Sequence, residues 1–136
     1  MFVLDASVVL KWFVDEPYSD KAQALRSRYV RGEIQLAVPD LLLHEVANAL
    51  RYKPSFTPKL VVESINTIFD MDIDIIAPVG HLMKSAIRIA YDFNITEYDA
   101  HYLAIAKDIG YKLITADEKF YRKIESTQLA QLLSKV

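Results

Sequence analysis

The chain has 136 residues, of which 52% are hydrophobic and 25% are charged, and it contains no cysteine. This length fits one domain over residues 1–136 that buries roughly two thirds of its unfolded surface, and the lack of cysteine excludes disulfides and thiolate metal ligands, which suits a reducing cytoplasm. The formal net charge of −2 excludes a basic field over the whole surface of the kind that attracts nucleic acid.

Strands and helices alternate along the predicted chain. A strand at 2–4 opens it and leaves no room for a signal peptide, and no apolar run approaches the ~18 residues of a membrane helix. Further strands are predicted at 34–38, 73–76 and 112–115. Helices are predicted at 8–13, 19 to about 30, 41–52 with Asp40 as its cap, 58–69, 80–93, 97–109 and 118–123. The segment 127–133 fits either an edge strand or a final helix.

This alternation is typical of an α/β fold. We expect a three-layer α/β/α sandwich around a mostly parallel central sheet. Because crossovers between parallel strands are right-handed, the strands that end at Asp5 and before Asp117 should bring these two residues to one rim of the sheet.

The stretch from Thr96 to Asp117 places two carboxylates in unusual positions. Asp99 falls on the apolar side of its predicted helix, and Asp117 follows a buried strand, where open parallel sheets bind their ligands. A structural explanation exists for each, since Thr96 and Asp99 match a capping box and Asp117 can cap the next helix.

Two further acidic residues fall where the same rim could collect them. Asp5 ends the first strand, and Glu45 lies at the edge of the apolar arc of its helix. Four carboxylates so close would repel one another unless a cation neutralised them. Hard oxygen ligands favour Mg²⁺ or Mn²⁺, which can polarise a phosphodiester and activate water.

Other chemistries are less well supported. The three glycines are isolated, so no phosphate-binding glycine loop is present. His101 lies about 160° from Asp99 on the helix wheel, which makes a shared ion difficult. Ser7 has no histidine base at a plausible spacing, and Ser7 and Thr115 are better explained as hydroxyls that orient carboxylates or a bound water.

The motifs together resemble the PIN-domain ribonucleases, and among them the VapC-type toxins of prokaryotic toxin–antitoxin pairs. The resemblance rests on VLDASVVLKWF, PDLLLHEVANAL, YDAHYLAIAKDIGYKLITAD and the KF that follows, in this order over nearly the whole chain. It implies that Asp5, Glu45, Asp99 and Asp117 bind Mg²⁺ or Mn²⁺ and that Ser7 and Thr115 support them. It also implies an endoribonuclease, often dimeric, that a small antitoxin protein inhibits.

The sequence therefore predicts a metal-dependent endoribonuclease that cleaves single-stranded or loop RNA, with Arg51 and Lys53 as candidates to guide it. Two alternatives stay open, a non-catalytic RNA- or protein-binding module and, less favoured, a phosphoaspartate receiver-like domain. We also expect a homodimer, with the apolar segment Trp12 to Val14 near its interface.

Overall fold

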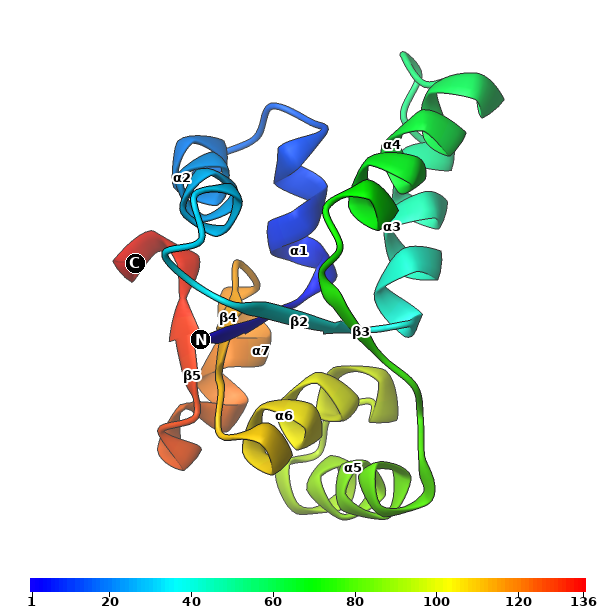
Figure 1. Cartoon of the computed structure of the whole chain (residues 1–136). Helices are drawn as coiled ribbons and strands as arrows, with labels where there is room; N and C mark the ends of the chain where they lie inside the picture. Colours follow the sequence, from blue (N-terminus) through cyan, green and yellow to red (C-terminus); the bar gives the residue numbers. More distant parts are fainter.

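The computed structural model describes all residues from 1 to 136 and contains five strands, which form one sheet in the order β3-β2-β1-β4-β5 (Figure 1). The strands are β1 (Phe2–Leu4), β2 (Leu36–Pro39), β3 (Asp74–Ile76), β4 (Lys112–Thr115) and β5 (Ala130–Leu132). Every pairing is parallel. The predicted α/β/α fold is confirmed, and the sheet is parallel throughout.

Seven α-helices connect and cover these strands. They are α1 (Ala6–Val9), α2 (Ser19–Val30), α3 (Leu41–Arg51), α4 (Pro58–Asp70), α5 (Gly80–Phe93), α6 (Glu97–Ile109) and α7 (Glu118–Ile124). Short 3-10 turns follow at Leu10–Trp12, Glu125–Thr127 and Leu133–Lys135. Helices α5 and α6 cover one face of the sheet, and α1 to α4 lie on the other side (Figure 1).

The strand order reverses direction at β1, which pairs with β2 on one side and with β4 on the other. From β1 the chain winds outward to β2 and β3, then returns through α5 and α6 to β4 and β5. A sheet of this kind leaves a crevice outside the carboxyl ends of the two strands at the reversal. Residues that follow β1 and β4 therefore line the expected place for a ligand.

The hydrophobic core explains why α6 is the central helix. Seven consecutive residues, Ala100 to Ala106, are buried, because α6 packs against both the sheet and α5. Thr96 accepts a hydrogen bond from the Asp99 amide and begins the helix, and Gly110 ends it with φ of 73°. A left-handed residue at this position is the usual helix stop.

Several local expectations needed correction. Strand β2 begins at Leu36 and β3 at Asp74, two residues and one residue later than predicted. Asp40 adopts a helical backbone and caps nothing with its side chain. Segment 127–133, for which an edge strand and a final helix were both possible, contains the edge strand β5, which pairs with β4. In the segment Trp12 to Val14, Trp12 is only 5% exposed and belongs to the core, whereas Phe13 and Val14 are partly exposed.

None of the helices combines the length and the apolar character required to cross a bilayer.

Candidate active site

Asp5 follows β1 directly and is 6% exposed. Its carboxylate accepts hydrogen bonds from the Ser7 hydroxyl and from the Val8 amide, so it also begins helix α1. The sequence placed Asp5 at a strand end but did not indicate this capping role. A buried carboxylate that accepts two short-range hydrogen bonds is held in a fixed orientation.

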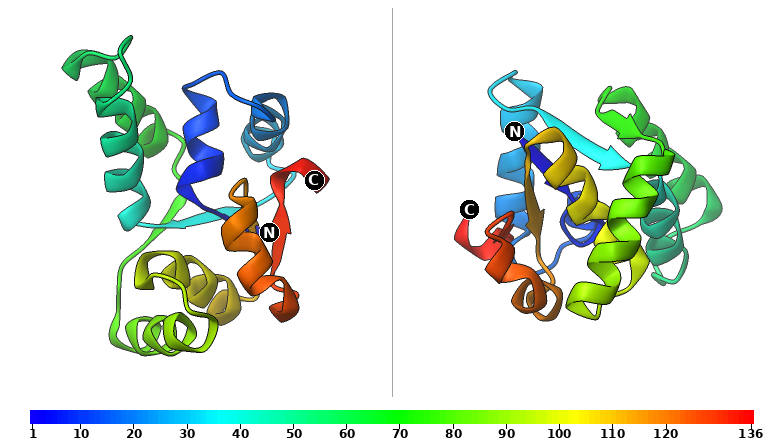
Figure 2. Two further views of the ribbon diagram at one scale, coloured as in Figure 1. Left: turned by 180° about the vertical axis from the view of Figure 1, so that it is seen from behind. Right: turned by 90° about the horizontal axis from the view of Figure 1, so that it is seen from below.

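The hydroxyls of Ser7 and Thr115 join the ends of β1 and β4. Their oxygens lie 3.5 Å apart, and the Ser7 oxygen also accepts from the Ala116 amide at 2.8 Å. The Thr115 oxygen accepts from the Asp117 amide at 3.0 Å. These bonds fix the turn before α7 beside the start of α1, as seen from behind (Figure 2). The structure therefore gives both hydroxyls the orienting position that was predicted for them.

Asp117 caps α7 with one carboxylate oxygen, which accepts from the Phe120 amide at 3.0 Å. The structural explanation for this residue is thus correct, and it does not compete with a role in the site. The turn fixed by Thr115 aims the exposed Asp117 side chain at the pocket that Asp99 also lines. A capping carboxylate keeps its second oxygen available.

Asp99 lies in the first turn of α6 and is half-buried. Thr96 caps the Asp99 amide at 3.1 Å, but the Asp99 carboxylate accepts no backbone hydrogen bond in return. A complete capping box needs that second bond, so the box is incomplete, and the hydrogen-bond partner of the Asp99 carboxylate is the Thr96 side chain, which lowers the Asp99 pKa.

Glu45 reaches the same region from the middle of α3. The hydroxyl of the buried Tyr102 donates to its carboxylate at 2.6 Å. The sequence missed Tyr102, although it stands three residues after Asp99 and therefore on the same side of α6. Its apolar neighbours made it resemble an ordinary core residue.

The four carboxylates act on each other electrostatically. Burial, partly offset by the Ser7 and Thr115 hydroxyls, raises the pKa of Asp5 from 3.8 to about 6, and the charge of Asp99 adds to the increase. Burial also raises the pKa of Asp99, with a contribution from Asp117. Burial and then Asp99 raise the pKa of Glu45, while the Tyr102 hydrogen bond lowers it. Asp99 is thus the common neighbour of the other three.

No lysine, arginine or histidine lies within 4 Å of any of these carboxylates, whereas seven other ion pairs occur in the chain. As the side chains are oriented, no three of them converge closely enough to ligate one ion. A shared ion therefore requires some of these side chains to rotate toward one another. The donor set, oxygen only and without a compensating cation, fits Mg²⁺ or Mn²⁺.

The histidines lie outside this cluster. His101 is buried on another side of α6, with Nδ1 3.3 Å from Glu97, and neither of its ring nitrogens makes a hydrogen bond. Together with His44 and Asp40 it lines a separate pocket of about 240 Å³. His81 pairs with Asp108 on the surface. None of them reaches the four carboxylates.

Comparison with known proteins supports the same family. Ribonuclease VapC3 of Pyrobaculum aerophilum is 29% identical over 126 residues, which is 89% of this chain and 92% of that protein. The crystal structure of PAE2754 from the same organism superposes with a TM-score of 0.72 at 19% identity, covering 98% of this chain and 84% of that one. VapC20 of Mycobacterium tuberculosis, described as a toxin that cleaves the sarcin–ricin loop, gives 0.73 at 12% identity, covering 90% and 94%.

These matches confirm the resemblance drawn from the motifs. The family comparison aligns residues 2–125 with the PIN domain, so the match begins in β1 and ends after α7. It includes all four carboxylates and both hydroxyls of the site. The chain belongs to the PIN-domain family.

Proposed function

We propose that the chain is a Mg²⁺- or Mn²⁺-dependent endoribonuclease of the VapC type. The observation that carries the proposal is a set of four carboxylates, without a compensating cation, at the reversal point of a PIN-domain sheet. The similarity to a ribonuclease over nearly the whole chain supports the choice of substrate class.

Asp5, Asp99 and Asp117 would hold the cation, and Glu45 would complete the set directly or through water. A divalent ion bound there supplies Lewis-acid polarisation of the phosphodiester and lowers the pKa of water. The hydroxyls of Ser7 and Thr115 hold the ends of β1 and β4 together, which would keep Asp5 and Asp117 near each other for this role.

Glu45 is the best candidate for the general base. Burial raises its pKa above the ordinary glutamate value, which makes it a better proton acceptor. It would take a proton from a water whose oxygen attacks phosphorus, while the phosphorus–oxygen ester bond on the opposite side breaks and the leaving oxygen is protonated by solvent. Tyr102 keeps one Glu45 oxygen oriented during this transfer.

We also propose that the protein is the toxin of a toxin–antitoxin pair, which a small antitoxin inhibits. Similar structures include a toxin–antitoxin complex from Klebsiella pneumoniae and VapBC2 of Rickettsia felis bound to a promoter DNA fragment. A homodimer remains a prediction, and light scattering of the purified protein at high micromolar concentration tests it.

The test of the nuclease is cleavage of mixed cellular RNA with Mn²⁺, with Mg²⁺ and with a chelator. We expect internal cuts in the two metal reactions and none with the chelator. RNA binding without cleavage in any metal would contradict the proposal and favour the non-catalytic binding module.

A further inference from the structure

A pocket of about 550 Å³ adjoins the carboxylate site, formed by the loop before α6, the first turn of α6 and helix α7. Two carboxylates, Asp99 and Asp117, and two lysines, Lys119 and Lys123, are among the residues that line it. Its volume lies in the range of about 300–1,000 Å³ that is usual for ligand sites. The pocket therefore extends the proposed nuclease site toward two positive charges.

The two kinds of charge in this pocket do not neutralise each other. Neither lysine has a carboxylate within 4 Å, and neither Asp99 nor Asp117 has a cation within that distance. The Lys123 ammonium instead donates to the backbone carbonyl of Asn94 at 3.0 Å, which holds it over the pocket. Lys123 keeps two more N–H donors for a ligand.

A ligand that satisfies both kinds of charge must present anionic groups to the lysines and also reach the carboxylates through a cation. A nucleic acid strand does this, because successive phosphates are one nucleotide apart and each carries a negative charge. Ammonium groups bind phosphate as point charges and read no base. The contribution of this pocket should therefore be independent of sequence.

We propose that Lys119 and Lys123 form a subsite for the phosphate next to the scissile bond of the RNA. This inference rests on the proposed nuclease function and extends it to substrate binding. Arg51 and Lys53, expected from the sequence to guide RNA, are engaged elsewhere: Arg51 lies over the ring of Tyr52 and Lys53 pairs with Glu16.

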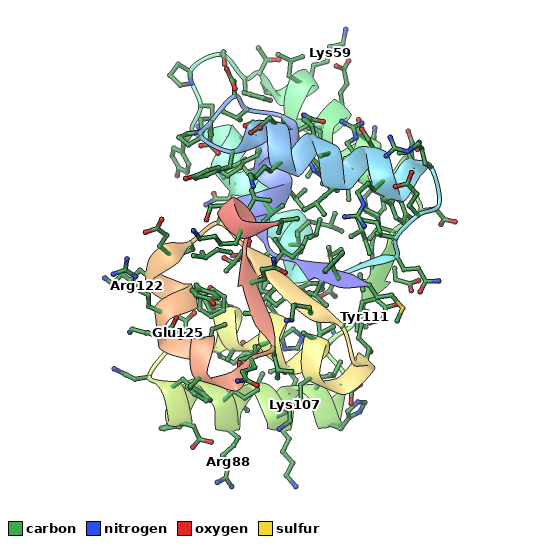
Figure 3. All side chains as sticks on the ribbon, turned by 90° about the vertical axis from the view of Figure 1, so that its left-hand side faces the viewer. Lys59, Arg88, Lys107, Tyr111, Arg122 and Glu125 are labelled. Atoms are coloured by element: carbon green, nitrogen blue, oxygen red, sulfur yellow. The ribbon has the colours of Figure 1, made fainter.

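The test compares Lys119→Ala, Lys123→Ala and the double variant with Arg122→Ala. Arg122 is on the same helix but points outward (Figure 3), pairs with Glu118 and does not line the pocket. All three residues are exposed, so each variant should fold. Affinity for a labelled single-stranded RNA is measured by anisotropy in an Asp5→Asn background, and KM and kcat are measured in the parent.

Each lysine variant should weaken RNA binding and raise KM about tenfold at low salt, with a smaller change in kcat. The slope of log Kd against log salt should fall by about 0.7 per lysine, equally for unrelated RNA sequences. Arg122→Ala should change the RNA affinity and the salt slope much less. The midpoint of Mn²⁺ binding without RNA should stay near that of the parent in every variant.

Lysine variants that match Arg122→Ala in affinity and salt slope would overturn the subsite, even if the parent cuts RNA normally. Variants that shift the Mn²⁺ midpoint but leave RNA affinity unchanged would also overturn it, because the lysines would then act as counter-ions of the carboxylates. A parent that neither binds Mn²⁺ nor cuts RNA would overturn the nuclease proposal, and the subsite with it.

Discussion

Helix α6 carries polar groups of two different characters. Asp99 and Tyr102 belong to the carboxylate site, where the neighbouring charges are all negative and none has a cation within 4 Å. Glu97 and His101 line the other pocket, where the Glu97 carboxylate lies 3.3 Å from Nδ1 of the His101 ring. Only on the first side do neighbouring carboxylates raise one another's pKa, so we expect this side to respond most strongly to a divalent cation.

The largest effect is expected from Asp5→Asn. This change removes one negative charge from the most buried carboxylate of the site but keeps its size and its ability to accept from Ser7 and Val8. Cleavage should fall by about a hundredfold or more, because the cation loses a ligand. Initial rates on a labelled RNA with Mn²⁺ measure it, and circular dichroism verifies the fold. A variant that cuts at the parent rate would remove Asp5 from the site.

The pH dependence of stability without metal is the second prediction. The pKa of Asp5 is raised from 3.8 to about 6 in the fold, so the folded state holds this proton more tightly than the unfolded state. The stabilisation is complete below about pH 4 and is lost as the pH rises through about 6. A shift of this size corresponds to roughly 3 kcal/mol of unfolding free energy.

Urea unfolding with a chelator at several pH values between 4 and 7.5 measures this loss. Asp5→Asn serves as the control, because it lacks the titrating group and should show a flatter profile. Parallel profiles for the two proteins would contradict the assigned cause, which is burial of an ionisable carboxyl group.

Tyr102→Phe should have a smaller effect. It removes only the hydroxyl that donates to Glu45, so kcat should fall about tenfold with little change in KM. The hydrogen bond lowers the pKa of Glu45, and its loss should raise that pKa and move the acidic limb of the rate profile to higher pH. A merely structural tyrosine would not shift the limb. Tyr98→Phe, at an exposed residue of the same helix, is the matched control.

The sequence predicted the parts of the molecule that depend on local patterns. The cap at Thr96 and the whole of α5 agree with the structure, because each follows from a few neighbouring residues. Asp5 and Asp117 could be placed at the same rim because parallel strands with right-handed crossovers align their ends.

What could not be predicted depends on contacts between distant residues. The bond from Tyr102 to Glu45 joins residues 57 positions apart, and the Ser7–Thr115 contact spans 108. Trp12 looked like an interface residue because no pattern shows that its indole donates to the Ala22 carbonyl within the core. The pocket with Lys119 and Lys123 likewise depends on how α7 meets the loop before α6.

The smallest effect separates the two sides of α6 most directly. Asp99→Asn removes the charge that raises the pKa of both Asp5 and Glu45, so the metal-free protein should become more stable, by about 0.5–1 kcal/mol since the half-exposed site is screened by solvent. Glu97→Gln, two residues away on the other side of α6, should give no such gain in stability.

Mn²⁺ should raise the melting temperature of the parent and of Glu97→Gln, and much less that of Asp99→Asn, because binding stabilises only a competent site. Thermal unfolding of the three proteins with chelator and with Mn²⁺ makes the measurement. If Asp99→Asn gains as much from Mn²⁺ as Glu97→Gln does, Asp99 is no ligand, and its place in the first turn of α6 is explained by the helix end alone.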